Sequence, residues 1–203
     1  MKSLSEIETV SKRSSKATGF SWGIAEEIGK NIRILEMFGL SGIKNLNYYF
    51  KVRNVKKFEK LNLIDKENKT PKEEFCPIIA GISFLDQVRS LESFSVINFE
   101  KIAYPLLFLP FVSRASEIIG KKIKLKIDNK LFLLNFNNSI YSNSLKYENL
   151  EIGNILTIKF LSNSDLFSEK EWSELYKLSE DTFVEESDSL KESGAGAGLT
   201  DND

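Results

Sequence analysis

The spacing of apolar residues changes once along this chain, near residue 120, and this change limits the folds that the chain can adopt. Before that point apolar side chains recur every three or four residues, which is typical of amphipathic helices. After it, Ile123, Leu125 and Ile127 alternate with lysines, and residues 155–161 show the same alternation. Such alternation is typical of antiparallel strands with one buried and one solvated face. Helices followed by strands predict an α+β fold, with N-terminal helices packed on a mostly antiparallel sheet.

Capping and termination signals predict where the N-terminal helices begin and end. Ser3 begins a capping box, and Gly19 can adopt the left-handed conformation that ends a helix. A second helix is predicted over residues 21–38, a third over residues 41–61, and a lysine-rich loop over residues 63–74. The predicted buried stripe of the second helix consists of Ile24, Ile28, Ile32, Leu35 and Phe38.

The remainder of the chain gives more varied signals. Residues 78–91 fit either a helix or a strand, residues 96–102 are expected to be extended, and residues 106–119 are expected to be helical. A last helix is predicted over residues 168–179, starting with a second capping box at Ser168. The docking face of this helix would be formed by Trp172, Leu175 and Tyr176.

Charge divides the chain into a basic body and an acidic C-terminal segment. Residues 1–164 carry a formal charge of +8 and residues 165–203 carry −9. We therefore predict a single α+β domain over residues 1–164, and a C-terminal helix with a flexible, acidic, Gly/Ala-rich tail over residues 165–203. Residues 44–72 mix lysines with aromatic residues, a composition also found in proteins that bind single-stranded nucleic acid. The net charge of −1 and the preference for Lys over Arg disfavour that function.

The chain contains no His and one Cys, which excludes several classes of site. A Ser–His–Asp triad, a Cys–His pair and a His-ligated metal site all need His, and disulfides or Cys-cluster metal sites need more than one Cys. No metal site is predicted, and no cofactor can be named. The longest apolar run, residues 102–112, is shorter than the roughly 20 residues that a membrane-spanning helix needs. Without a signal-peptide pattern, and with a free thiol, the protein is expected to be cytoplasmic and not to bind membranes.

The first candidate site lies in residues 19–29 and the helical turn that follows. On a helical wheel Glu26 points away from the apolar stripe, whereas Glu27 lies at its margin and Asn31 falls inside it. A carboxylate beside an amide at a half-buried face can acquire a shifted pKa. Glu27 is therefore a candidate general base and, with Trp22 and Asn31, a candidate ligand- or partner-binding residue. The alternative is a structural pair that satisfies nearby backbone groups. We expect Glu27 to be largely buried and Glu26 to be exposed.

The second candidate is Cys76. Pro77 follows it, and Pro is favoured at the first position of a helix. If a helix begins there, the positive end of the helix would lower the pKa of the Cys76 thiol and make it nucleophilic or sensitive to oxidation. A packed, unreactive thiol is the simpler interpretation. Asp86 is a further polar residue that could serve as its partner.

The third candidate is the C-terminus, where tiny residues over positions 194–198 precede Leu199, Thr200, Asp201, Asn202 and Asp203. Ordering Gly and Ala costs backbone entropy with little apolar return, so such a segment becomes ordered only in a tight site that supplies hydrogen bonds. These last five residues are therefore candidates for ligand or partner binding. The alternative is a flexible, solvated terminus.

Four stretches distributed over nearly the whole chain carry a family resemblance. They are Gly19-Phe20-Ser21-Trp22-Gly23-Ile24-Ala25-Glu26-Glu27, Phe75-Cys76-Pro77-Ile78-Ile79-Ala80-Gly81, Tyr104-Pro105-Leu106-Leu107-Phe108-Leu109-Pro110-Phe111 and the terminal Gly-Ala-Gly-Leu-Thr-Asp-Asn-Asp. Together they resemble the uncharacterised bacterial domain-of-unknown-function family 3726. The resemblance implies no activity, cofactor or site residue, because the family has no assigned function.

These observations favour a non-catalytic accessory protein of small-molecule metabolism that binds a ligand or a protein partner. The reasons are the lack of a catalytic constellation and the unusual C-terminus. The competing hypothesis is a cofactor-independent enzyme that uses Glu27 as an acid/base, with Cys76 nearby. Nucleic-acid binding through residues 44–72 is a third and weaker hypothesis.

Overall fold

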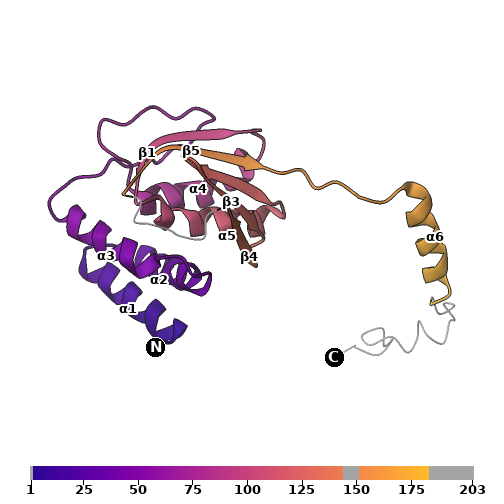
Figure 1. Ribbon diagram of the computed structural model, residues 1–203, viewed down its shortest axis with the longest axis horizontal. Helices are drawn as coiled ribbons and strands as arrows, with labels where there is room; N and C mark the ends of the chain where they lie inside the picture. Colours follow the sequence, from indigo (N-terminus) through magenta and orange to yellow (C-terminus); the bar gives the residue numbers. More distant parts are fainter. Residues whose placement is uncertain (1, 144–150, 183–203) are drawn as a thin grey trace, which may run out of the picture. The chain divides into compact units, whose positions relative to one another are not determined.

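The computed structural model describes residues 2–143 and 151–182. The chain divides into two compact units, Met1–Asn163 and Ser164–Asp203. In its described residues, the first unit has five α-helices, a short 3-10 helix and a five-stranded antiparallel sheet, and the second has one helix (Figure 1). The predicted α+β class is confirmed.

Three helices open the chain: α1 (Leu4–Ala17), α2 (Trp22–Met37) and α3 (Gly42–Arg53). The Ser3 side chain caps α1 by accepting a hydrogen bond from the backbone N–H of Glu6, as the capping signal predicted. Helices α1 and α2 pack closely because α2 carries Gly29 where they meet. A Cβ atom at Gly29 would lie 2.8 Å from the backbone oxygen of Glu8.

Helix α3 is shorter than the sequence predicted, because it ends at Arg53 rather than near residue 61. The following residues make contacts that a continued helix would prevent. Phe58 stacks on Tyr49 with ring centroids 5.3 Å apart, and Glu59 accepts a backbone hydrogen bond from Cys76. The segment after α3 is therefore held as a loop against the start of the next helix.

The middle of the chain contains α4 (Pro77–Leu91), β1 (Ile97–Ala103), the 3-10 helix η1 (Pro105–Leu107) and α5 (Leu109–Ile119). Residues 78–91, which fitted either a helix or a strand, are helical. Gly120 ends α5 with a φ of 64°, the left-handed conformation that favours glycine.

The sheet is completed by β2 (Ile123–Ile127), β3 (Lys130–Asn135), β4 (Ser139–Ser142) and β5 (Ile152–Phe160). Its strand order is β1-β5-β2-β3-β4, so the last strand lies between the first and second. The alternation in β2 buries Ile123, Leu125 and Ile127 and leaves the lysines exposed, as predicted. The sequence did not predict β4.

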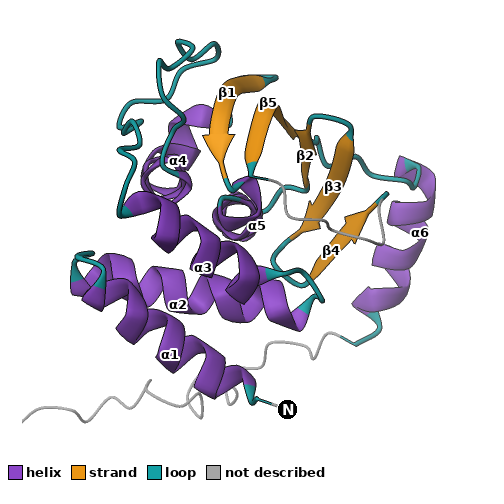
Figure 2. Ribbon diagram, turned by 60° about the vertical axis from the view of Figure 1, so that its left-hand side comes forward, coloured by secondary structure: helices purple, strands orange, loops and turns teal. Residues whose placement is uncertain are grey.

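Helices α4 and α5 pack on one face of the sheet (Figure 2). Phe84 of α4 stacks on Phe160 of β5 with ring centroids 6.4 Å apart, and Ser116 of α5 donates a hydrogen bond to the carbonyl of Leu134 in β3. Helix α2 packs on α5 and α3 packs on η1, so the N-terminal helices reach the sheet through this middle layer. The predicted stripe residues Ile28, Ile32 and Leu35 are buried.

The second unit is described by α6 (Glu169–Glu180) and the residues around it. Ser168 and Glu171 form the predicted capping box. No residue of α6 is buried. Within the described part of the chain, no helix is both long enough and apolar enough to cross a membrane.

Candidate functional site

A cavity of about 680 Å³ lies between the α1–α2 turn, the end of α3, the loop after it and the start of α4. All of its lining residues fall between positions 18 and 79. We call it the helix-end cavity. Its lining includes four cationic residues and no acidic one. The cations are Arg53, Lys56, Lys57 and Lys60.

One wall of the helix-end cavity is the turn between α1 and α2. Gly19 has a φ of 94°, and the backbone N–H of Phe20 donates to the carbonyl of Ser15 over 3.2 Å. Ser21 then caps α2, with its side chain accepting a hydrogen bond from the N–H of Ile24. The motif that begins at Gly19 thus places the start of α2 at the cavity, where Ser21 and Ile24 contribute to the lining.

Arg53 is held rigidly at this wall. Its guanidinium donates a hydrogen bond of 2.5 Å to the carbonyl of Thr18 and lies over the ring of Phe20, 4.1 Å from the ring centroid. A guanidinium that is bonded on one edge and stacked on one face keeps its remaining N–H groups available for an anion.

The opposite wall contains Cys76, which is buried and is the N-cap of α4. Its sulfur accepts a long hydrogen bond from the N–H of Ile79 and lies 2.9 Å from the phenol oxygen of Tyr49. Tyr49 is completely buried, and this burial, together with the nearby Cys76, raises the pKa of Tyr49 above its usual range. The phenol is therefore neutral at any physiological pH.

The remaining cations differ in how far they are neutralised. Lys56 forms ion pairs with Glu74 and Glu73, and the hydrogen bond that Lys56 donates to Glu74 raises the pKa of Lys56. Lys57 and Lys60 are exposed, and neither has an ion-pair partner within 4.0 Å among residues 2–143 and 151–182. The helix-end cavity therefore has uncompensated positive charge at its mouth.

Glu27 lies in a different place, at a cavity of about 300 Å³ formed by α2, α4 and α5. Its carboxylate pairs with Arg114 of α5 and with Lys30, 3.4 Å away. The Glu27 side chain is 26% exposed, so most of it is buried, as expected, although the pair lies at the rim between helices. Glu26 is more exposed, at 47%, and pairs with Lys12 and Lys30.

The other predicted site residues do not come together. Asp86 shares the cavity of Glu27, not that of Cys76. The Trp22 ring is 57% exposed and lies under the Lys16 ammonium, 5.5 Å from it. Asn31 is buried, and its side-chain nitrogen and oxygen have no hydrogen-bond partner among the described residues. The last five residues, Leu199, Thr200, Asp201, Asn202 and Asp203, lie outside the described residues.

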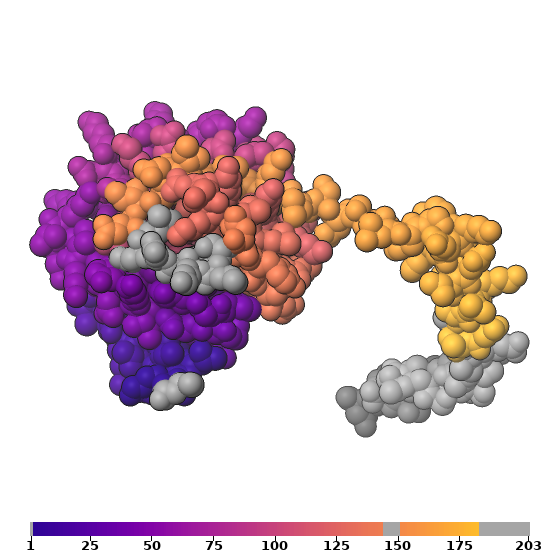
Figure 3. Space-filling model, viewed as in Figure 1, coloured from indigo at the N-terminus to yellow at the C-terminus, as the bar shows by residue number. Residues whose placement is uncertain are grey.

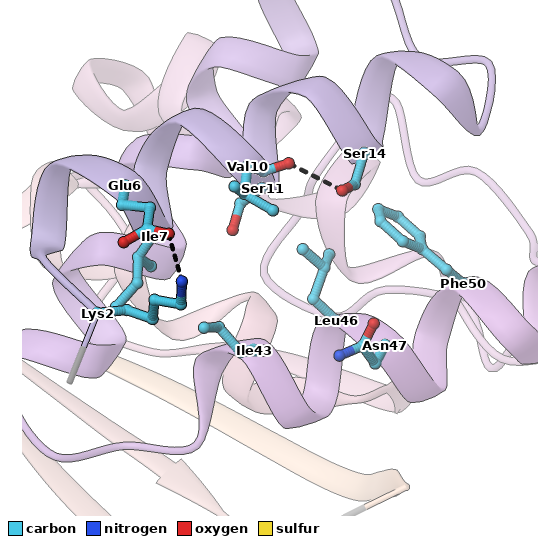
Figure 4. Close-up of a pocket in the computed structure, with 10 residues that line it drawn as sticks. All are labelled: Lys2, Glu6, Ile7, Val10, Ser11, Ser14, Ile43, Leu46, Asn47 and Phe50. Carbon is cyan, nitrogen blue, oxygen red and sulfur yellow. Dashed lines mark hydrogen bonds and ion pairs between the residues drawn. The ribbon is translucent and has the colours of Figure 1, made fainter.

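A smaller hollow of about 170 Å³ runs between α1 and α3 (Figure 4). Ile7 and Val10 of α1 line it together with Leu46 and Phe50 of α3. Five of its ten lining residues are apolar and five are polar or charged, and none is a predicted site residue. Neither this hollow nor any other described region brings together three acidic, His or Cys residues that could hold a metal ion.

The roles of Arg53 and Tyr49 in the helix-end cavity were not predicted from the sequence. The available signal was the mixture of basic and aromatic residues over positions 44–72, which we weighed only as a nucleic-acid-binding stretch. The pairing of this segment with the turn at Gly19 and with Cys76 depends on tertiary structure, because the three segments are distant in sequence.

The comparisons with known proteins bear on this part of the chain. Residues 2–80 match the model of the family described as "Protein of unknown function (DUF3726)". No curated protein and no solved structure matches the chain significantly. The match includes two of the four stretches that carried the resemblance, the one from Gly19 and most of the one from Phe75. It also includes every residue that lines the helix-end cavity. Over residues 2–80, the chain is thus confirmed as similar to the DUF3726 family, whose function is unknown.

Proposed function

We propose that the protein is a non-catalytic accessory protein of small-molecule metabolism that binds a small anionic ligand in the helix-end cavity. The observation that carries the proposal is the lining of that cavity, with four cationic residues and no acidic one. The ligand class is a small molecule that carries a phosphate or carboxylate group.

The preference for an anion follows from the electrostatics of the walls. Arg53 is fixed by Thr18 and Phe20, so it loses little conformational entropy when it binds an anion. The first turns of α2 and α4 both reach the cavity, and the N-terminus of a helix attracts negative charge through its free N–H groups and its dipole. Lys57 and Lys60 add charge that no described acidic residue offsets.

The rest of the ligand is expected to be apolar or flat. Phe20, Tyr49 and Phe58 contribute aromatic rings to the lining, and Ile24 and Ile79 contribute aliphatic groups. Small-molecule sites commonly combine an apolar lining with a few polar groups that fix the orientation of the ligand.

A location in the bacterial cytoplasm is part of the proposal. The free Cys76 supports it, because an unpaired thiol persists in a reducing compartment. An accessory role is compatible with a protein partner that delivers the ligand to this protein or receives the ligand from it. The terminal residues Leu199–Asp203 remain candidates for binding such a partner. Deletion of residues 194–203 should then weaken partner capture without changing the melting temperature.

The competing function is a cofactor-independent enzyme that uses Glu27 as an acid/base. Glu27 and Cys76 line different cavities, and both carboxylate oxygens of Glu27 already pair with cations. The observation that favours thiol chemistry is the contact between Cys76 and Tyr49. Turnover of a bound metabolite that disappears in Glu27→Gln would favour the enzyme over the binding protein.

Calorimetric titration of the full chain tests the proposal, with inorganic pyrophosphate and succinate as separate probes for phosphate and carboxylate. The test variant is Lys57→Gln/Lys60→Gln, and the control is Lys124→Gln/Lys126→Gln, which removes the same charge from exposed positions on β2. We expect the test variant to bind about tenfold more weakly, a loss of about 1.4 kcal/mol, and the control to bind as the wild type does. Equal weakening in both variants, or no heat with either probe, would overturn the proposal.

A further inference from the structure

The outer face of the sheet, opposite α4 and α5, carries a group of lysines. Lys122, Lys124 and Lys126 are exposed and alternate with the buried residues of β2. Lys159 of β5 lies directly opposite Lys124 in the antiparallel register. These strands reach the molecular surface in the salmon and orange region of Figure 3.

Placing two lysines opposite each other costs stability, because like charges on a cross-strand pair repel. Among residues 2–143 and 151–182, none of these four lysines has an ion-pair partner within 4.0 Å. Apolar side chains border the lysines: Leu133 of β3 lies opposite Lys124, and Tyr141 of β4 lies opposite Leu133. The Tyr141 side chain is 59% exposed. This lysine face therefore suits a partner that is both acidic and apolar.

Helix α6 has those two properties. Trp172, Leu175 and Tyr176 lie on one side of it, and each of them is more than half exposed. Phe167 extends this apolar side by stacking on Trp172, with ring centroids 5.6 Å apart. The acidic residues of α6 outnumber its lysines, and they are Glu169, Glu171, Glu174 and Glu180. A helix with an apolar side that nothing buries gains little stability by itself.

We propose that α6 of one copy of the chain docks on the lysine face of a second copy. Helix α6 has 12 residues and is about 18 Å long at 1.5 Å per residue. The five-residue strand β2 is about 17 Å long at 3.4 Å per residue. The glutamates of α6 would neutralise the lysine pair while its aromatic side covers Leu133 and Tyr141. Two reciprocal contacts of this kind form a closed dimer with twofold symmetry.

Charge reversal in the full chain tests this proposal without relying on a truncated protein. One variant carries Lys124→Glu/Lys126→Glu, and the other carries Glu174→Lys/Glu180→Lys, which leaves the capping box of Ser168 and Glu171 intact. All four positions are exposed, so both variants should keep the fold and the melting temperature of the wild-type protein. Light scattering coupled to size exclusion gives the mass of the wild type, of each variant and of their equimolar mixture at low salt.

We expect a dimer for the wild type and a dissociation constant at least tenfold weaker for each variant alone. In the mixture, the acidic sheet of one variant meets the basic helix of the other, and the reverse contact is equally complementary, so the dimer should return. A wild type that is monomeric at about 100 μM, or a mixture that stays monomeric, would overturn the proposal. Docking of α6 within a single chain would appear as a monomer with a blue-shifted Trp172 emission and would also overturn it. Pyrophosphate binding in the helix-end cavity is a separate readout that these variants should leave unchanged.

Discussion

The phenol oxygen of Tyr49 lies 2.9 Å from the sulfur of Cys76, and this contact joins the end of α3 to the start of α4. Both residues are buried, and Phe58 stacks on the Tyr49 ring from the intervening loop. The contact thereby fixes two walls of the helix-end cavity relative to each other. The residues that shape the cavity are consequently also residues that stabilise the fold.

Tyr49→Phe should lower the free energy of unfolding by about 1 kcal/mol, because it removes the buried hydrogen bond between Tyr49 and Cys76. The Cys76 sulfur then keeps only the long hydrogen bond from the N–H of Ile79. Urea unfolding measures the loss. Tyr48→Phe is the matched control, since the Tyr48 side chain is 38% exposed, and its effect should stay within about 0.5 kcal/mol. Equal stability of the Tyr49→Phe variant and the wild type would show that the contact does not contribute.

Gly81→Ala should lower the free energy of unfolding by about 1–3 kcal/mol, because the added methyl group would overlap the ring of Phe111 between α4 and α5. Gly23→Ala places the same methyl group in α2, where no atom lies within 4 Å, and should stabilise the helix by up to about 1 kcal/mol. Thermal unfolding of the two variants should therefore give shifts of opposite sign. Shifts of the same sign would contradict the packing of α4 on α5.

The ion pair between Lys56 and Glu74 should make stability depend on acid pH. Burial alone would raise the pKa of Glu74, but the hydrogen bond and charge of Lys56 lower it below the usual value of 4.5. A carboxyl with a lower pKa in the folded state binds fewer protons there, so stability rises with pH in this range. The contribution of Glu74 is complete above pH 4.5 and is lost as pH falls through the lower folded pKa.

Glu74→Gln should therefore be less stable than the wild type near neutral pH, and the difference should shrink as the pH falls below 4.5. Urea unfolding at several pH values measures this, and Glu73→Gln serves as the control because that side chain is 59% exposed. A difference between wild type and Glu74→Gln that grew as the pH fell would refute the assignment.

Glu27→Gln should lower stability without affecting ligand binding in the helix-end cavity. The variant removes the ion pair between Glu27 and Arg114, and partial burial already lowers the pKa of Arg114. The expected loss is about 1–2 kcal/mol, between the values for exposed and buried ion pairs. Glu26→Gln, on the exposed side of the same helix, should lower the free energy of unfolding by less than Glu27→Gln does. An unchanged melting temperature combined with lost pyrophosphate binding would instead make Glu27 a functional residue.

Local patterns in the sequence predicted the helix starts well. Ser3, Ser21 and Ser168 each cap a helix where predicted, because capping depends on residues only three positions apart. Such local patterns could not predict the strand order, because β5 lies between β1 and β2 through long-range pairing. The end of α3 was also mispredicted, because contacts of Phe58 and Glu59 with distant residues override the helical propensity.

The candidate site was predicted only in part for the same reason. The sequence singled out Cys76 and the segment from Gly19 separately, but nothing local indicated that they line one cavity with Arg53. Conversely, the competing enzyme hypothesis placed Cys76 near Glu27, whereas the fold places the two residues at different cavities.

The most direct test of the central claim is to map anion binding by amide chemical shifts in the ¹⁵N-labelled full chain during titration with pyrophosphate. We expect saturable shifts, at matched ionic strength, at the first turns of α2 and α4, where Ser21, Ile24 and Ile79 line the cavity. We expect little change at the Glu27 cavity, reported by Ile82 and Ile118. Shifts no larger than those from sodium chloride, or shifts centred on Ile82 and Ile118, would contradict an anion site in the helix-end cavity.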